Sequence, residues 1–244
     1  MKFKNIGMRM IATLVPVILV ATTLLTVISI TVSKNITKEQ VEETMNATLS
    51  SAEQQVAKNI NSVKADASTL SMAVSAGYED MSLAQFEQML QGIIGSDDII
   101  LGSGLWFEPY VFDKDEKYVG PYVYKDGDEY VTTYDYSNAE YDYFSQEYYT
   151  LAKDSLEPIV TDPYYDETSG TIMASCSSPV YSADSTFLGC VTVDIELSSI
   201  QEMINSITIG ENGYAVLLSS TGTYLAGLGI PEESISNAVL ITED

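Results

Sequence analysis

The chain has 244 residues, of which 45% are hydrophobic and 19% charged, so it can bury a core without disulfide or metal support. The 35 Asp and Glu outnumber the 11 Lys and Arg, and this net charge of −24 argues against nucleic acid as a partner, because phosphate binding needs a basic surface. The absence of His excludes Ser-His-Asp catalysis, HExxH metalloprotease sites and His-ligated zinc or haem. We therefore predict no cofactor, no metal site and no catalytic residues.

An uncharged apolar segment near the N-terminus predicts a transmembrane helix. Residues 10–33 carry no charged side chain, and at 1.5 Å per residue they cross a hydrocarbon core about 30 Å thick. The basic residues Lys2, Lys4 and Arg9 precede the segment, so the positive-inside rule places residues 1–9 in the cytoplasm and the rest of the chain outside the cell. A cleaved signal peptide is the alternative, which the length of the segment disfavours.

The next segment, residues 34–76, predicts one long helix. It contains neither Gly nor Pro, and its apolar residues recur three or four positions apart. Such a helix is about 60 Å long, which suits a stalk rising from the membrane, with an ordinary core helix as the alternative. We expect this stalk to pair with a second copy of the chain. A shorter helix is predicted over residues 82–94, after the cap residue Ser82.

Beyond residue 96 the pattern changes to short apolar runs separated by Gly, Pro and Asp. A helix is predicted again over Leu197–Ile207, with two further strands after it. Helices followed by an antiparallel sheet are typical of an α+β fold. The main strands are predicted over Ile99–Phe107, Tyr122–Tyr124, Tyr130–Tyr134, Ile172–Ser178 and Leu188–Ile195.

The two cysteines, Cys176 and Cys190, flank a predicted hairpin centred near Ala183. They have the same parity about this centre, so we expect them on one face of neighbouring strands. Two interpretations stay open. An oxidising exterior permits a disulfide, and two small buried thiols are the alternative.

Several motifs follow the predicted membrane helix in a fixed order. They are Gly104-Leu-Trp-Phe-Glu-Pro, Asp142-Tyr-Phe-Ser-Gln-Glu-Tyr-Tyr, Asp162-Pro-Tyr-Tyr-Asp, Ser178-Pro-Val-Tyr, Gly189-Cys-Val-Thr-Val-Asp-Ile-Glu-Leu and Gly213-Tyr-Ala-Val-Leu. This set resembles the extracytoplasmic part of double Cache (dCache) sensors, which belong to bacterial chemoreceptors and sensor kinases. The resemblance implies a membrane-distal, PAS-like ligand-binding lobe over residues 77–195 and part of a smaller membrane-proximal lobe over residues 196–244. The second membrane helix and the cytoplasmic output would then be missing, so we expect a truncated receptor.

The resemblance also implies a binding site. The amino-acid-binding dCache subfamily uses an Arg and an aromatic pair for the ligand carboxylate, and a Tyr-x-Asp and a late Asp for its ammonium group. The Arg position falls on Gln146 in this sequence. The site is thus expected to keep its amine half and to lose its carboxylate half. The other positions fall on Tyr141, Tyr148, Tyr149, Tyr164, Asp166 and Asp194.

The chemistry of these residues agrees with that expectation. Gln146 supplies no charge, and the only Arg of the chain is Arg9, on the predicted cytoplasmic side. Two carboxylates within a ring of Tyr suit a cation, through ion pairing and cation–π contacts. The other aromatic residues of this region are expected to pack rather than to bind, namely Trp106, Tyr118, Tyr122, Tyr124, Tyr130, Tyr134 and Tyr136.

The sequence therefore predicts a non-enzymatic, extracellular small-molecule sensor of a transmembrane chemotaxis receptor at the cell membrane. Its ligand is predicted to be a small organic amine, with the amino-acid class as the close alternative. The input domain of a sensor kinase, cyclase or phosphatase is a second hypothesis, which the missing output segment would decide. An anchored glycosidase that uses two carboxylates is a third, disfavoured hypothesis.

Overall fold

The computed structural model describes residues 6–127, 129–166, 171–207, 213–218, 222 and 224–227. The chain divides into two compact units, Met1–Ser51 and Ala52–Asp244. The predicted orientation of the N-terminus depends on Lys2 and Lys4, which lie outside the described residues, as does much of the predicted second lobe.

The predicted membrane segment and the predicted stalk form one continuous helix, α1 (Ile6–Gly77), with Pro16 inside it. In the described part of the chain, α1 is the one helix long and apolar enough to cross a membrane, with a mean hydropathy of 2.5 in its most apolar window. Its threonine hydroxyls donate to carbonyls three or four residues earlier, as Thr22 does to Ile18 at 2.9 Å. Such internal bonding satisfies polar groups in a helix that enters lipid.

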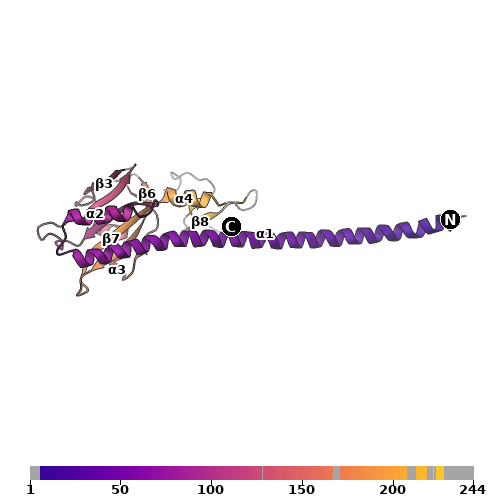
Figure 1. The fold of residues 1–244 in the computed structure, drawn as a ribbon, viewed down its shortest axis with the longest axis horizontal. Helices are drawn as coiled ribbons and strands as arrows, with labels where there is room; N and C mark the ends of the chain where they lie inside the picture. The colour runs from indigo at the N-terminus through magenta and orange to yellow at the C-terminus, as the bar shows by residue number, and fades with distance from the viewer. Residues whose placement is uncertain are drawn as a thin grey trace. The chain divides into compact units, whose positions relative to one another are not determined.

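The last turns of α1 belong to the core of the second unit. Val63, Ala67, Leu70 and Val74 are buried at helical spacing and pack in one cluster with α2 (Leu83–Ile94) and the sheet. Figure 1 shows both helices beside the sheet. Ser71 anchors the helix further, because its hydroxyl donates to the carbonyl of a residue on the sheet, Pro179. The alternative of an ordinary core helix thus describes only this end of α1.

The sheet has seven strands, all paired antiparallel, and confirms the α+β fold. The order is β3-β2-β1-β7-β6-β4, and β5 also pairs with β6. The strands are β1 (Ile100–Phe107), β2 (Tyr122–Asp126), β3 (Glu129–Thr133), β4 (Ile159–Val160), β5 (Tyr164–Asp166), β6 (Thr171–Tyr181) and β7 (Phe187–Glu196).

Five further elements interrupt or follow this sheet. A short 3-10 turn (Tyr143–Ser145) and α3 (Glu147–Asp154) lie between β3 and β4, where no helix was predicted. The predicted helix after the sheet is present as α4 (Leu197–Asn205). Beyond it, β8 (Val216–Leu218) and β9 (Tyr224–Gly227) pair as a separate two-stranded sheet.

The two faces of the sheet have different character, because successive strand residues point to opposite sides. On β7, Val193 and Ile195 face the aliphatic cluster formed with α1 and α2. Cys190 faces the other side, where the neighbouring residues are mostly aromatic, Trp106 and Tyr122 among them. The polar residues that alternate with the aliphatic ones on β7 therefore lie on the aromatic face.

The expectation that Cys176 and Cys190 share a sheet face is wrong, and both are free, buried thiols. Near the turn, Tyr181 pairs with Phe187, which would preserve the expected parity. A bulge follows, so that Val180 pairs with Gly189 and the register shifts by one residue. Gly189 has a φ of 140°, a conformation that favours glycine. The shift places Cys176 in the aliphatic cluster and Cys190 in the aromatic one, so the disulfide cannot form.

Candidate ligand-binding site

A small cavity lies on the aromatic face of the sheet. The volume of the cavity is about 10 Å³, which leaves room for about one water molecule. Its polar lining comes from Ser175, Thr192, Asp166 and Asp194, and Met173 adds an apolar contact. Six aromatic residues complete the walls, namely Trp106, Tyr122, Tyr136, Tyr141, Tyr148 and Tyr164.

The strand register gathers the polar residues at one place. Ser175 of β6 pairs directly with Asp194 of β7, and Tyr164 of β5 pairs with Met173, so these four side chains share a face. The Tyr164 and Ser175 hydroxyls are hydrogen-bonded at 2.7 Å. The late Asp and the Tyr-x-Asp of the sequence analysis are thus brought together by the pairing of three strands.

A glycine on β1 lets the tryptophan ring lie close to the sheet. A Cβ atom at Gly104 would overlap the ring of Trp106, so only glycine leaves room for it there. The Trp106 indole donates from Nε1 to Thr192 Oγ1 at 3.2 Å. Trp106, predicted as a core residue, is indeed 2% exposed, and it also lines the cavity.

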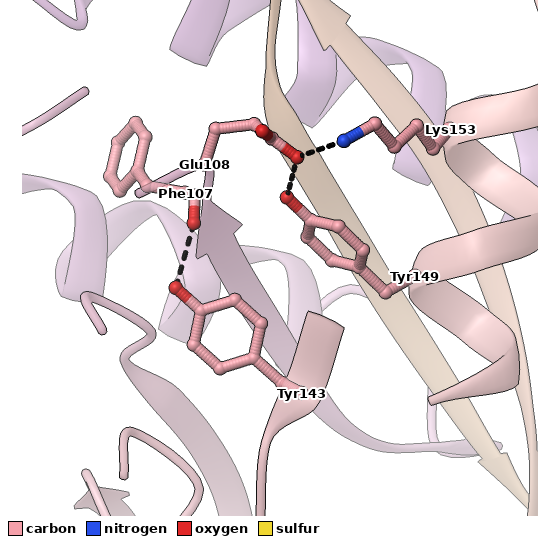
Figure 2. Close-up of polar contacts among 5 residues, drawn as sticks. All are labelled: Phe107, Glu108, Tyr143, Tyr149 and Lys153. Carbon is pink, nitrogen blue, oxygen red and sulfur yellow. Dashed lines mark hydrogen bonds and ion pairs between the residues drawn. The ribbon is translucent and has the colours of Figure 1, made fainter. Parts of the chain in front are cut away.

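Helix α3 is fixed over this face by polar contacts with the end of β1. The Tyr149 hydroxyl donates to Glu108 Oε1 at 2.6 Å, and Lys153 forms an ion pair with the same oxygen at 2.6 Å. The Tyr143 hydroxyl donates to the Phe107 carbonyl at 2.7 Å (Figure 2). This anchoring directs Tyr149 toward Glu108, so Tyr149 is a positioning residue rather than a cavity residue. The preceding Tyr148 lines the cavity instead.

No Lys or Arg among the described residues lines the cavity that holds the two carboxylates. Asp166 is 4% exposed and accepts a hydrogen bond from the Tyr136 hydroxyl at 2.7 Å. Asp194 is 2% exposed, and its Oδ1 has no hydrogen-bond partner among the described residues. The buried Tyr122 hydroxyl also lacks a hydrogen bond of good geometry among the described residues, although it lies close enough to Asp194 to lower the pKa of that carboxyl. Unsatisfied buried polar groups are rare, and here they point into a cavity, as expected of a binding site.

Burial raises the pKa of Asp194 to about 7, although hydrogen bonds with the Ser175, Tyr122 and Thr192 side chains oppose the rise. Asp166 adds to it through charge repulsion. The cavity is thus electronegative and desolvated, and its carboxylates favour a cation over an anion.

A wider cleft adjoins the cavity and opens to solvent. It measures about 730 Å³ and shares Tyr141, Tyr164 and Asp166 with the cavity wall. Gln146 lines this cleft and not the cavity. Its Nε2 donates to the Tyr141 carbonyl at 3.0 Å, so the amide helps to hold the loop that carries Tyr141.

The structure therefore places five of the seven predicted site residues around the cavity, and Gln146 and Tyr149 outside it. Sequence reasoning missed Tyr122 and Tyr136, which were predicted as packing residues, and the polar pair Ser175 and Thr192. Alternation along β7 would have found Thr192, which lies on the same face as Asp194, whereas the expected parity put Ser175 on the opposite face and only the bulge near Gly189 brings it to Asp194. The five are Tyr141, Tyr148, Tyr164, Asp166 and Asp194.

Comparison with known proteins identifies relatives of this domain. The family model of the methyl-accepting chemotaxis protein-like first PDC sensor domain matches residues 86–202. The chain is 33% identical over 87 residues to the methyl-accepting chemotaxis protein PscA of Pseudomonas syringae pv. tomato and 31% identical over 88 residues to McpC of Bacillus subtilis. Each match covers 36% of this chain, but only 14% and 13% of the relatives' own lengths.

Solved structures share the fold. A methyl-accepting chemotaxis protein X is similar with a TM-score of 0.67 at 22% identity, over 82% of this chain and 76% of that one. The extracellular domain of the putative histidine kinase mmHK1S-Z3 has a TM-score of 0.57 at 23% identity, over 78% and 69%. The ligand-binding domain of the Campylobacter jejuni chemoreceptor Tlp3 in complex with L-norvaline has a TM-score of 0.60 at 13% identity, over 81% and 72%.

The raised pKa of Asp194 predicts a specific pH dependence of stability. The folded chain holds this proton more tightly than the unfolded chain, whose Asp has a pKa near 4, so the contribution is fully present below about pH 4 and is lost as the pH rises through about 7. Asp194→Asn, which is neutral at every pH, lacks this loss. We expect its free energy of unfolding, relative to the native chain, to rise by roughly 2–4 kcal/mol between pH 4 and pH 8.

Denaturant unfolding of both proteins across this range, without ligand, measures the difference. The native chain serves as the reference for all other titrating groups. Parallel pH profiles for the two proteins would show that Asp194 is ionised in the folded state at neutral pH without cost, contrary to the expectation.

Proposed function

Because the chain carries a PDC/Cache-like sensor domain of the methyl-accepting chemotaxis protein type, we propose that it is the non-enzymatic, extracytoplasmic input part of a transmembrane chemoreceptor that binds a small organic amine. The observation that carries the ligand class is Asp194 Oδ1, a buried acceptor without a partner among the described residues, inside an aromatic cage. An ammonium group supplies both the donor and the charge that this oxygen lacks.

An α-amino acid fits the same site less well. The Tlp3 domain has been solved with L-norvaline and with L-valine, so the fold accommodates amino acids in that protein. In this chain the ligand carboxylate would enter next to Asp166 and Asp194. No Lys or Arg among the described residues lines the cavity or the cleft. Burying a carboxylate without such a partner costs several kcal/mol.

The strand that carries Asp194 supports a route for the signal. Asp194 lines the cavity, and the next residue, Ile195, faces the opposite side of the sheet. There Ile195 borders a small apolar space together with Val56 and Ile60 of α1. Along the strand, Ile195 alone therefore lies between the carboxylate of Asp194 and the helix that contains the candidate membrane span.

A sensor kinase input domain is the second candidate. The fold similarity to the mmHK1S-Z3 extracellular domain supports it, although the TM-score of 0.57 is lower than the 0.67 for the methyl-accepting chemotaxis protein X. The matched curated relatives are all methyl-accepting chemotaxis proteins, and this favours the chemoreceptor.

We further propose that α1 pairs with a second copy of the chain. Val41, Met45 and Leu49 recur every four residues on one side of α1 and are exposed, in a helix whose other residues there are mostly polar. Met45→Cys is expected to form an intermolecular disulfide on mild oxidation in membranes. Glu43→Cys, about half a helical turn away, is the matched control and should cross-link much less. Equal cross-linking at both positions would contradict the proposed pairing.

The ligand class is tested with a matched pair of compounds. n-Butylamine and L-norvaline differ only in the α-carboxylate. Trp106 is the only tryptophan of the chain and lines the cavity, so its fluorescence reports binding to the full chain in lipid nanodiscs. We expect n-butylamine to bind at least about tenfold more tightly than L-norvaline, because the buried carboxylate costs more than about 1.4 kcal/mol.

Asp194→Asn should weaken n-butylamine binding by at least about 30-fold, since about 2 kcal/mol or more is lost when a buried charge loses its partner. Glu157→Gln removes an exposed carboxylate outside the cavity and the cleft and is the control, which should bind as the native chain does. Tighter binding of L-norvaline, or unchanged amine binding by Asp194→Asn, would refute the proposed ligand class.

A further inference from the structure

The cleft outside the cavity carries acidic groups that a monoamine leaves unused. Asp135 and Glu140 line it together with Asp166, and both are exposed. They belong to one loop, whose shape is held by Asn138. The Asn138 Oδ1 atom accepts hydrogen bonds from the backbone N–H of Glu140 at 2.8 Å and from that of Tyr141 at 2.9 Å. The loop therefore presents two carboxylates to the cleft from a fixed turn.

The sequence offers almost nothing to neutralise these groups. From residue 126 to the C-terminus, Lys153 is the only basic residue. It forms an ion pair with Glu108 at 2.6 Å and does not line the cleft. The segments after residue 126 that lie outside the described residues contain no Lys or Arg either.

The size of the cavity determines where the rest of a ligand must lie. With room for about one water, the cavity accommodates an ammonium group but not an alkyl chain. The chain must leave past the shared wall, which consists of Tyr141, Tyr164 and Asp166, and so enters the cleft. The far end of a ligand bound through Asp194 therefore lies among the carboxylates of Asp135 and Glu140.

We propose that the ligand is a linear α,ω-diamine, with one ammonium group in the cavity against Asp194 and the second in the cleft against Asp135 and Glu140. This inference rests on the proposed function, because the first ammonium site is the amine site proposed above. Two independent observations support it: the buried, unpartnered oxygen of Asp194 requires a donor, and the cleft beyond it favours a second positive charge.

Calorimetric titration of the full chain in nanodiscs tests the second site. The probes are α,ω-diamines of about three to six carbons, each compared with the n-alkylamine of the same length, and the corresponding ω-amino acids. We expect the best diamine to bind at least about tenfold more tightly than its monoamine, and the ω-amino acid to bind most weakly because its carboxylate faces Asp135 and Glu140.

A double variant, Asp135→Asn with Glu140→Gln, locates the effect. It should bring the best diamine to within about threefold of its monoamine when both are measured on the same variant, because the second ammonium group loses its carboxylate partners. Glu157→Gln changes one charge elsewhere on the surface and should leave the diamine advantage intact. An equal loss in that control would mean that the general field of the acidic chain, and not the cleft, favours diamines.

The outcomes separate the two proposals. Equal affinities for diamines and monoamines would overturn the second site while leaving the amine function standing. A diamine advantage that survives in the double variant would overturn its placement at Asp135 and Glu140. Binding of α-amino acids without binding of any amine would refute the proposed function itself.

Discussion

A carboxylate buried without a countercharge is the constraint on which the binding region depends. Asp194 is 2% exposed and has an oxygen without a partner among the described residues, while Asp166 lies in the same cavity. Such a group is tolerated only if it is protonated or if a cation joins it. The raised pKa of Asp194 is the first solution, and the ammonium group of the proposed ligand would be the second. Ligand binding and the protonation of Asp194 are then alternatives for the same oxygen.

The elements around Asp194 serve to hold it in this position. Residue alternation on β7 directs Asp194 to the aromatic face, and the bulge near Gly189 sets the register that pairs it with Ser175. Gly104 leaves the space that the Trp106 ring occupies over the sheet. The contacts of Glu108 with Tyr149 and Lys153 fix α3 (Figure 2). The same helix carries Tyr148, which lines the cavity. The polar groups outside the cavity thus shape it without entering it.

The strands and the long helix could be predicted from the sequence because their signals are local. Period-two alternation and helical spacing depend on neighbouring residues alone. Helix α3 could not be predicted in this way, since its sequence, Glu-Tyr-Tyr-Thr-Leu-Ala-Lys-Asp, has a weak apolar pattern and its position depends on contacts with Glu108, about 40 residues earlier. The prediction that Cys176 and Cys190 share a sheet face was wrong for a similar reason. One bulge shifts the register of β6 and β7 by a residue, and it leaves no clear trace in the sequence. The resemblance located Tyr164, Asp166 and Asp194, whereas Tyr122 and Tyr136 were missed because strand and loop tyrosines more often pack than bind.

A crystal structure of the chain with n-butylamine would show directly whether an ammonium group is the hydrogen-bond partner of Asp194 Oδ1. We expect the amine nitrogen at about 2.7–2.9 Å from Asp194 Oδ1, surrounded by the rings of Trp106, Tyr122 and Tyr148, with the alkyl chain directed past Tyr141 toward the cleft. A nitrogen bound elsewhere, with Asp194 Oδ1 still unpartnered or bonded to water alone, would contradict it.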